Sequence, residues 1–589
     1  MSALNPSGPV LDDPKFLTEA PRKRRWPIIL LALVIVGGGA LFLLRGSGTM
    51  TRMVRIFNPD YRSKAYPPRV SLCTPAGAEV NVPVDTELLV ELDTHNSVLD
   101  DATVNDANVA VFRTGDHVRV PAKVTLSEDK KAITITPEKP LENGQNYTLK
   151  LSTSLKDKRG LSMLPFTASF NTKTKAEASL VFEKVALASA SGVGFTCVKM
   201  GPGHYLYAAS DIGKIFRYRI EADGKLASPE EFESLSKANN GPRLVTGFTF
   251  DPASTPENPI LWVPNSPAMF TNVPDFSDKL TRISGKNLDK VEDILINLPR
   301  SFRDHMTNQP SFGPDGALYI PQGSSSAFGA ADEEWGNREE HLLTAAILRL
   351  DTKALPSALP IDVKTVDAGG PYDPRVSGVP LTVYAKGIRM PYDMLWHSNG
   401  NLYSAVNGSS AGGNSPATKD VPGLKRISIA EHDWLFKIHK DKYYGHPNPA
   451  WNYFVLNGGN PTKDFDKFEV PFYPVGVQPE KDWEPAIYDL GSHISANGTI
   501  EYKGNAFGGK LKGALMICRY NVGADILTVK LDDKGNVGEI IMGIRGLTNF
   551  TNPLDIEQDE ANGNLYIADY GSQKIVLARP VENNTAKAH

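Results

Sequence analysis

The chain is poor in cysteine and has little excess of either charge. Its 589 residues include only three cysteines, Cys73, Cys197 and Cys518, so they could form at most one disulfide, and no CxxC pair indicates a metal site. Lys and Arg total 63 against 67 Asp and Glu, which gives a net charge of −4. Phosphate-loop and HExxH motifs are also absent. The sequence therefore excludes a disulfide scaffold and argues against a nucleic-acid partner, because such binding relies on positive charge.

One long hydrophobic run stands near the start of the chain. Residues 26–44 carry no charge and follow the basic cluster 22–25. A run of this length can span a bilayer, and the missing Ala-x-Ala site favours an uncleaved anchor over a signal peptide. Basic residues before a span stay in the cytoplasm. We predict a cytoplasmic segment at 1–25, a transmembrane anchor at 26–45 and a single-pass inner-membrane protein whose bulk is periplasmic or extracellular.

After a linker at 46–69, the sequence predicts short strands separated by turns. Segments 87–93, 132–137 and 147–152 alternate apolar and polar residues, which predicts a β-sandwich over residues 70–175. The phrase ITITPEKPLENGQNYTLKLS and the ending LKDKRGLSMLPFTASFNT resemble the bacterial Ig-like domain of surface-layer and other exported proteins. The resemblance implies a spacer or adhesion unit without chemistry of its own.

The rest of the chain contains a recurring phrase. An apolar strand, a turn rich in Gly, Asp and Asn and a second strand with Leu-Tyr recur in VKMGPGHYLYAAS, SFGPDGALYIPQG, LWHSNGNLYSAV and IEQDEANGNLYIAD. Paired strands of this kind are the inner strands of propeller blades. Internal repeats at this spacing predict a six-bladed β-propeller over residues 180–580. The whole is predicted to be an all-β protein with an N-terminal transmembrane helix.

Four ordered motifs in this second region add a family resemblance. They are RDHMTNQPSFGPDGALYIPQG from residue 303, YAKGIRMPYDMLWHSNG from 384, YYGHPNP from 443 and LGSHISANGTIEYKG from 490. In this order they resemble the glucose/sorbosone dehydrogenase family over most of residues 240–575. The resemblance implies oxidation of a sugar or polyol with pyrroloquinoline quinone (PQQ) and calcium, and a membrane quinone or cytochrome as electron acceptor.

The resemblance also assigns roles to residues. His305 would be the general base and Asp304 its partner, a role that suits histidine because its pKa lies near neutrality. A structural histidine at a strand end is the alternative. Cofactor contacts would come from basic residues, because PQQ carries three carboxylates; the candidates are Arg389, Arg519, Arg243 and His493.

The calcium loop of the family corresponds to the segment that begins at Gly408 and Ser409. It holds almost no carboxylate before Asp420, so any metal there would depend on backbone carbonyls. Two functions follow from the sequence. The first is a PQQ-dependent sugar or polyol dehydrogenase, and the second is a non-catalytic propeller that binds carbohydrate or a protein partner at the cell envelope.

Overall fold

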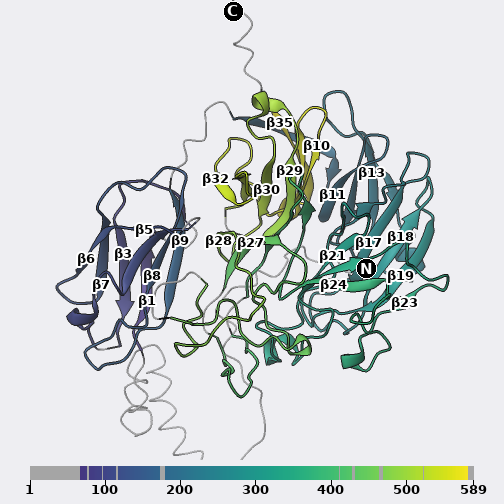
Figure 1. Cartoon of the computed structure of the whole chain (residues 1–589). Coiled ribbons are helices and arrows are strands. Elements are labelled where there is room, and N and C mark those ends of the chain that lie inside the picture. Colours follow the sequence, from purple (N-terminus) through teal and green to yellow (C-terminus); the bar gives the residue numbers. More distant parts are fainter. Residues whose placement is uncertain are drawn as a thin grey trace, which may run out of the picture. The chain divides into compact units, whose positions relative to one another are not determined.

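The computed structural model describes residues 67–75, 79–95, 97–114, 117–172, 180–409, 412–427, 431–462, 468–521 and 523–581. The regular secondary structure of these residues is almost entirely β-strand, with a single short α-helix among them, α4 (Ser234–Ala238). Figure 1 shows the strands in chain order, from purple at the first strand to yellow at the last.

No helix in these described ranges is long and apolar enough to cross a membrane. This finding contradicts the predicted localisation as a single-pass inner-membrane protein. The predicted anchor at 26–45 and the cytoplasmic segment at 1–25 lie outside the described residues, as does most of the predicted linker.

The first nine strands form two sheets. One sheet has the order β1-β3-β7-β6, and the other has the order β2-β9-β8-β4-β5, with β2 parallel to β9. Their bounds are β1 (Arg69–Thr74), β2 (Glu79–Val82), β3 (Leu88–Asp93), β4 (Val109–Arg113), β5 (Arg119–Val120), β6 (Ala122–Leu126), β7 (Ala132–Pro137), β8 (Asn146–Leu151) and β9 (Phe166–Thr172). The apolar positions of the alternating segments, such as Val90, Ile133 and Leu149, are fully buried in one shared core. The two-layer sandwich therefore follows from the period-two pattern.

The remaining strands form six further sheets, which we call the six-sheet region. The first two are β11 (Phe195–Gly201), β12 (Tyr205–Ser210), β13 (Ile215–Arg219), β14 (Glu230–Phe232), and then β15 (Arg243–Leu244), β16 (Thr249–Phe250), β17 (Ile260–Pro267), β18 (Asp278–Ser284), β19 (Lys290–Leu298), β23 (Ile361–Asp362). The third and fourth are β20 (Ser311–Phe312), β21 (Leu318–Gln322), β22 (Ala346–Leu350), β24 (Leu381–Lys386), and then β25 (Leu395–Trp396), β26 (Leu402–Val406), β27 (His432–Ile438), β28 (Tyr488–Ser492).

The fifth and sixth sheets complete the region. They are β29 (Ala496–Tyr502), β30 (Ala514–Arg519), β31 (Asp525–Leu531), β32 (Val537–Ile541), and then β33 (Pro553–Asp559), β34 (Asn564–Asp569), β35 (Lys574–Pro580) with β10 (Phe182–Ser191). The sixth sheet joins the first strand of the region to its last, because β10 pairs antiparallel with β35.

Six hydrophobic clusters pack each sheet against the next. The first sheet shares Cys197 and Tyr207 with Leu261 of the second, and the last sheet shares Ile575 with Val198 of the first. The four other clusters join the second sheet to the third, the third to the fourth, the fourth to the fifth and the fifth to the sixth. The clusters thus join the six sheets in order of sequence, and the six-bladed propeller stays a prediction.

Buried carboxylates add hydrogen bonds between neighbouring sheets. Asp278 accepts from the backbone N–H of Thr307 at 2.8 Å, Asp393 from Thr499 at 2.9 Å and Asp555 from Val198 at 2.8 Å. All three carboxylates are at most 1% exposed. Each bond satisfies a backbone donor between sheets, since buried polar groups need partners.

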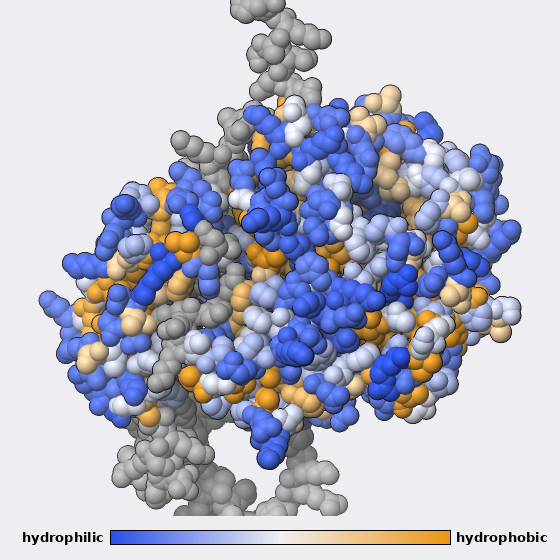
Figure 2. Space-filling model, in the orientation of Figure 1, coloured by the Kyte–Doolittle hydropathy of each residue, from blue (hydrophilic) through white to orange (hydrophobic). Residues whose placement is uncertain are grey.

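The surface carries both hydrophilic and apolar side chains. Figure 2 shows hydrophilic residues over most of the face in view, with smaller apolar patches between them. The exposed large apolar side chains include Met269 and Phe270, which are neighbours in the connection from β17 to β18.

Candidate functional site

His305 lies in the connection between β19 and β20, beside the residues that follow β21. The backbone N–H of Gly323 donates to the carbonyl of Met306 at 3.0 Å, which ties these two connections together. A Cβ atom at Gly323 would come within 2.8 Å of the Cβ of His305. Glycine is therefore required here, because the two segments approach each other closely.

The hydrogen bonds of His305 determine which ring nitrogen carries the proton. Its Nδ1 lies 3.1 Å from the carbonyl oxygen of Ser324 and 2.9 Å from Oγ of the same residue. The Ser324 hydroxyl donates to the carbonyl of Ser326 at 2.8 Å, so both Ser324 atoms act as acceptors for an Nδ1–H donor. Nε2 of His305 then carries the lone pair, and it has no hydrogen-bond partner among the described residues.

The electrostatic surroundings keep this ring neutral. Burial of His305, which is 4% exposed, disfavours its charged form, and the positive charges of Arg389 and Arg300 act in the same direction. Together they hold the pKa of His305 well below its ordinary value. A neutral imidazole with a free Nε2 is the form that can accept a proton.

Arg389, between β24 and β25, is the cation beside His305. Its backbone carbonyl accepts from the N–H of Ser324 at 2.8 Å, so Ser324 contacts both residues. The Arg389 guanidinium donates to the carbonyls of Gly408, Asn407 and Ala327 at 2.7, 3.2 and 3.3 Å. These bonds use Nε and Nη1, while Nη2 has no partner in the described part of the chain.

The aromatic ring of Trp335 lies beside both His305 and Arg389. Trp335 lies in the 3₁₀ turn η3 (Glu333–Trp335), and its ring centroid is 4.4 Å from that of His305. The guanidinium carbon of Arg389 lies 5.5 Å from the Trp335 ring centroid, within cation–π range. His305, Arg389, Trp335 and Ser324 thus form one cluster, which we call the His305 site.

A buried pair of Glu340 and His446 lies next to this site. Glu340 accepts from His446 Nε2 at 3.0 Å and from Ser326 Oγ at 2.6 Å, and also from the N–H groups of Ser325 and Ser326. Burial alone would raise the pKa of Glu340, but His446 and the other donors lower it to about 2. His446 Nδ1 and Ser325 Oγ are buried without a partner. Glu340 therefore stays ionised and fixes the serine segment that orients His305.

Arg300 holds the backbone of His305. Its guanidinium is 0% exposed, donates to the His305 carbonyl at 2.7 Å and lies 3.7 Å from Asp278. Because the carbonyl of His305 is held in this way, the backbone at the candidate base is fixed independently of its ring.

Asp304 is the residue expected to orient the ring of His305. The Nδ1 of His305 bonds to Ser324, and no hydrogen bond joins the Asp304 carboxylate to the ring. The half-buried Asp304 acts on Arg389 and Arg300 only through its charge. In the described structure Ser324, and not Asp304, holds the Nδ1 of His305, so an orienting role of Asp304 stays a prediction.

Two other predicted cofactor contacts have internal partners. Arg519 makes two bonds of 2.6 Å to Asp525, which faces it across the β30–β31 hairpin. Arg243 donates to Asn265 Oδ1 at 2.8 Å and to the carbonyls of Asn265 and Ser277 at 3.0 Å. Each of the two guanidinium groups bonds within the protein through Nε and Nη2, and no described contact places either of them beside His305.

The predicted metal loop is also occupied by protein contacts. The Gly408 carbonyl accepts from Arg389, and the Ser409 carbonyl accepts from the N–H of Glu431 at 2.7 Å. A guanidinium on the Gly408 carbonyl opposes a calcium ion there by charge repulsion. The described residues contain no cluster of three or more His, Cys, Asp or Glu that could hold a metal. His493 follows β28, is half-buried and acts on Asp433 through its charge.

These contacts decide how well the site fits PQQ. A tricarboxylate needs several cations, and of the three predicted arginines Arg389 is the one that the described contacts place beside His305. The residues present therefore match one carboxylate and do not match three.

The residues that sequence reasoning missed are those that hold His305 and Arg389 in place. They are Ser324, Trp335, Glu340, His446 and Arg300. A partial signal existed for Ser324, because it opens the run Ser324-Ser325-Ser326 directly after the LYIPQG strand. His446 lies within the YYGHPNP motif, although no role was assigned to it, and Trp335, Glu340 and Arg300 lie in connections without any motif.

Comparison with known proteins identifies only the first part of the chain. Residues 64–172 match the model of the bacterial Ig-like domain. This confirms the Ig-like resemblance of the sandwich. A search of curated proteins found no match.

Several solved structures are similar at low identity. A PQQ-bound aldose sugar dehydrogenase from Streptomyces coelicolor is 15% identical, with 68% of this chain and 98% of that chain covered and a TM-score of 0.43. The PQQ domain of pyranose dehydrogenase from Coprinopsis cinerea is 11% identical, with 68% and 97% covered and a TM-score of 0.43. An auxiliary nutrient binding protein from Bacteroides thetaiotaomicron is 12% identical, with 88% and 98% covered and a TM-score of 0.35. Likeness at these scores assigns no activity to this chain.

Proposed function

We propose that the six-sheet region is a six-bladed propeller and that its His305 site binds a sugar or polyol for oxidation. His305 takes the proton of one substrate hydroxyl, which is the proton-transfer half of a dehydrogenase reaction. The observation that carries the proposal is the neutral ring of His305, whose Nδ1–H is fixed by Ser324 and whose Nε2 is free to accept.

The neighbouring groups suit this role. A hydroxyl that loses its proton develops negative charge on oxygen, and the Nη2 of Arg389 supplies a positive group beside the base. The low exposure of His305 and Arg389, 4% and 7%, strengthens this electrostatic interaction because little water screens it.

A dehydrogenase also needs a group that accepts the hydride. The sequence resemblance implies PQQ, but Arg519 and Arg243 are paired within the protein. This observation favours a second function, in which the same site binds a carbohydrate without oxidising it.

One experiment separates the two functions. The purified full-length chain is titrated with PQQ with and without calcium, and dye reduction is followed over a panel of aldoses. Sugar-dependent dye reduction that is lost in His305→Ala supports the dehydrogenase, and the loss is expected to be about 10²- to 10⁴-fold, the usual contribution of a general base.

A matched control is His439→Ala, which removes a histidine whose side chain is 44% exposed and paired with Glu484. This variant is expected to keep wild-type activity. A folded protein that binds aldoses, but shows neither PQQ binding nor dye reduction, would refute the dehydrogenase and leave carbohydrate binding as the function of the site.

A further inference from the structure

His341 lies between two carboxylates that come from two other connections of the six-sheet region. It directly follows Glu340 in the connection between β21 and β22. Its Nδ1 lies 3.0 Å from Oδ2 of Asp367, which belongs to the 3₁₀ turn η4 (Val366–Ala368) between β23 and β24. Its Nε2 lies 3.9 Å from Oδ2 of Asp275, in the connection between β17 and β18. The ring therefore has a carboxylate at each of its two nitrogens.

This arrangement needs more protons than a neutral imidazole carries. A neutral ring has hydrogen on one nitrogen and a lone pair on the other. With hydrogen on Nδ1, the ring donates to Asp367 but presents a lone pair to the negative charge of Asp275, and the other tautomer reverses the two. Only a ring with hydrogen on both nitrogens attracts both carboxylates. The geometry therefore favours a charged His341 that joins all three connections.

The groups around the ring act in the same direction. Burial of His341, whose side chain is 15% exposed, would by itself lower its pKa, but Asp367, Asp275 and Glu340 raise that pKa above its ordinary value. The ring centroid of Phe276 lies 5.0 Å from that of His341, a distance at which an aromatic ring attracts a cation.

The cations around this cluster do not titrate near neutral pH. They are Arg338 near Asp275, Arg375 near Asp367 and Lys364, whose Nζ lies 5.3 Å from the Phe276 ring centroid. Arginine and lysine side chains ordinarily stay charged between about pH 5 and 9, whereas histidine changes its charge in this range. His341 is therefore the group through which pH acts on these connections.

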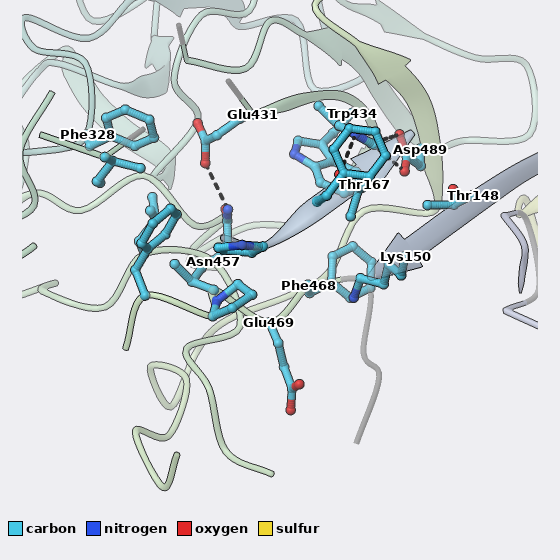
Figure 3. A pocket seen from close by; sticks show the side chains of 18 of the residues that line it. Thr148, Lys150, Thr167, Phe328, Glu431, Trp434, Asn457, Phe468, Glu469 and Asp489 are labelled. Carbon is cyan, nitrogen blue, oxygen red and sulfur yellow. Dashed lines mark hydrogen bonds and ion pairs between the residues drawn. The ribbon is translucent and has the colours of Figure 1, made fainter. Parts of the chain in front are cut away.

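His432 is a useful comparison, because its two nitrogens face one carboxylate and one hydroxyl. It lines the cavity drawn in Figure 3, where Asp489 and Thr167 are labelled. Its Nδ1 lies 2.7 Å from Asp489, and its Nε2 lies 3.3 Å from the Thr167 hydroxyl, which can donate or accept. A neutral His432 therefore satisfies both neighbours, whereas a neutral His341 satisfies only one of its two.

The contact with Asp275 holds the connection between β17 and β18. The N–H of Phe276 donates to Asp275 Oδ1 at 2.8 Å, and the other carboxylate oxygen is the one that faces His341. The same connection provides the carbonyl of Met269, which accepts from Arg300 at 3.1 Å, and Arg300 also holds the backbone of the candidate base. His341 thus contacts a connection that borders the candidate site.

We propose that His341 is a pH-dependent clamp: the doubly protonated ring holds Asp275 of the β17–β18 connection to Asp367 of η4, and the neutral ring releases Asp275. Asp275 is the partner that is released because its contact is 3.9 Å long. Asp367 accepts a hydrogen bond of 3.0 Å, which the neutral ring keeps through Nδ1–H. The clamp does not depend on the proposed function of the candidate site.

The direction of the pH effect follows from the raised pKa of His341. When the folded-state pKa lies above the unfolded value, the stabilisation is complete below about pH 6.5 and is lost as the pH rises through the folded-state pKa. Val273 keeps its bonds to Phe302 and Arg338 throughout, because these bonds do not titrate in this range. The loosening is therefore confined to residues 274–277.

The first measurement is a ¹⁵N NMR titration of the histidine-labelled full-length chain from about pH 5 to 9, with His341→Gln to assign the signal. We expect a ring with hydrogen on both nitrogens at about pH 6, a titration midpoint above the ordinary histidine value, and a lower midpoint in Asp275→Asn. A ring that is neutral at about pH 6, or a midpoint that Asp275→Asn leaves unchanged, would overturn the proposal.

The second measurement is hydrogen–deuterium exchange of a peptide that covers residues 274–277, corrected for the intrinsic pH dependence of exchange. The wild type should exchange about two- to fivefold faster at one pH unit above the NMR midpoint than at one unit below it, the factor that a partly exposed ion pair contributes. His341→Gln and Asp275→Asn should exchange at the faster rate at both pH values. Asp275 is suited to substitution because its side chain is 28% exposed.

His439→Gln is the matched control, because His439 pairs with the single carboxylate of Glu484. This variant should keep the pH dependence of the wild type. Exchange that is independent of pH in the wild type, or a wild-type pH dependence that persists in His341→Gln and Asp275→Asn, would refute the clamp. A pH dependence that is lost equally in His439→Gln would also overturn it.

Discussion

Replacing Glu340 by Gln tests whether the buried pair of Glu340 and His446 holds the His305 site together. Gln keeps the size of the side chain and removes its charge. His446 and the serine segment then lose an ionised acceptor, although Gln can still accept one or two hydrogen bonds.

The magnitude follows from the pKa of Glu340. Its value falls from the ordinary 4.5 to about 2, and about 1.4 kcal/mol for each pKa unit gives roughly 3 kcal/mol that favours the ionised form in the folded state. We therefore expect Glu340→Gln to lower the free energy of unfolding by about 3 kcal/mol at neutral pH. Solvent screening does not reduce this value much, because the Glu340 side chain is 0% exposed.

The pH dependence gives a second, independent signature. Because the folded-state pKa lies below the unfolded one, the stabilisation is complete above about pH 5 and is lost as the pH falls from about 4.5 towards 2. Urea unfolding followed by tryptophan fluorescence from about pH 7 to pH 3 is the assay. The gap between wild type and variant should narrow as the pH falls.

The neighbouring Glu339 supplies a matched control. It is exposed, and Glu339→Gln should change the free energy of unfolding by less than about 0.5 kcal/mol. Equal stability of Glu340→Gln and Glu339→Gln at neutral pH would refute the reasoning, as would a gap that stays constant down to pH 3.

Three further predictions concern other buried groups. Arg519→Met leaves Asp525 buried without its partner and should cost about 3–5 kcal/mol in urea unfolding, with part of this recovered in Arg519→Met/Asp525→Leu; an unchanged stability would contradict the pairing. Burial raises the pKa of Asp555, so the free energy of unfolding of the wild type should fall as the pH rises above the ordinary carboxyl range. Asp555→Asn should make the free energy of unfolding less dependent on pH between about pH 5 and 8. An equal pH dependence in the two proteins would refute this prediction. Ser324→Ala leaves only a carbonyl to accept from the ring of His305, so kcat should fall about tenfold with little change in KM, less than in His305→Ala; a loss confined to KM would exclude the orienting role.

The recurring Leu-Tyr phrase made much of the fold predictable. Its four copies fall in β12, β21, β26 and β34, each an interior strand of a different sheet. Both side chains are buried in every copy. The phrase can be recognised in the sequence because a strand that is buried on both faces is apolar over its whole length. The aspartates that join neighbouring sheets carry no such pattern, since their partners are backbone groups more than a hundred residues away in two of three cases.

The site was predictable only in its two central residues. Motif resemblance selected His305 and Arg389, which the structure brings together through Ser324. It also selected Arg519, whose pairing with Asp525 across a hairpin could have been foreseen from their spacing of six residues. The partners of Arg243 are the side-chain amide of Asn265 and backbone carbonyls of other segments. These contacts have no sequence pattern and are seen only in the folded chain.

The protonation of His305 is the most direct test of the central claim. ¹⁵N NMR of histidine-labelled protein, with His305→Gln to assign the signal, reports which ring nitrogen carries hydrogen. The account predicts a neutral ring with hydrogen on Nδ1 and a bare Nε2 at neutral pH, because the pKa of His305 lies well below its ordinary value. A ring protonated on both nitrogens at neutral pH, or a neutral ring with hydrogen on Nε2, would contradict it.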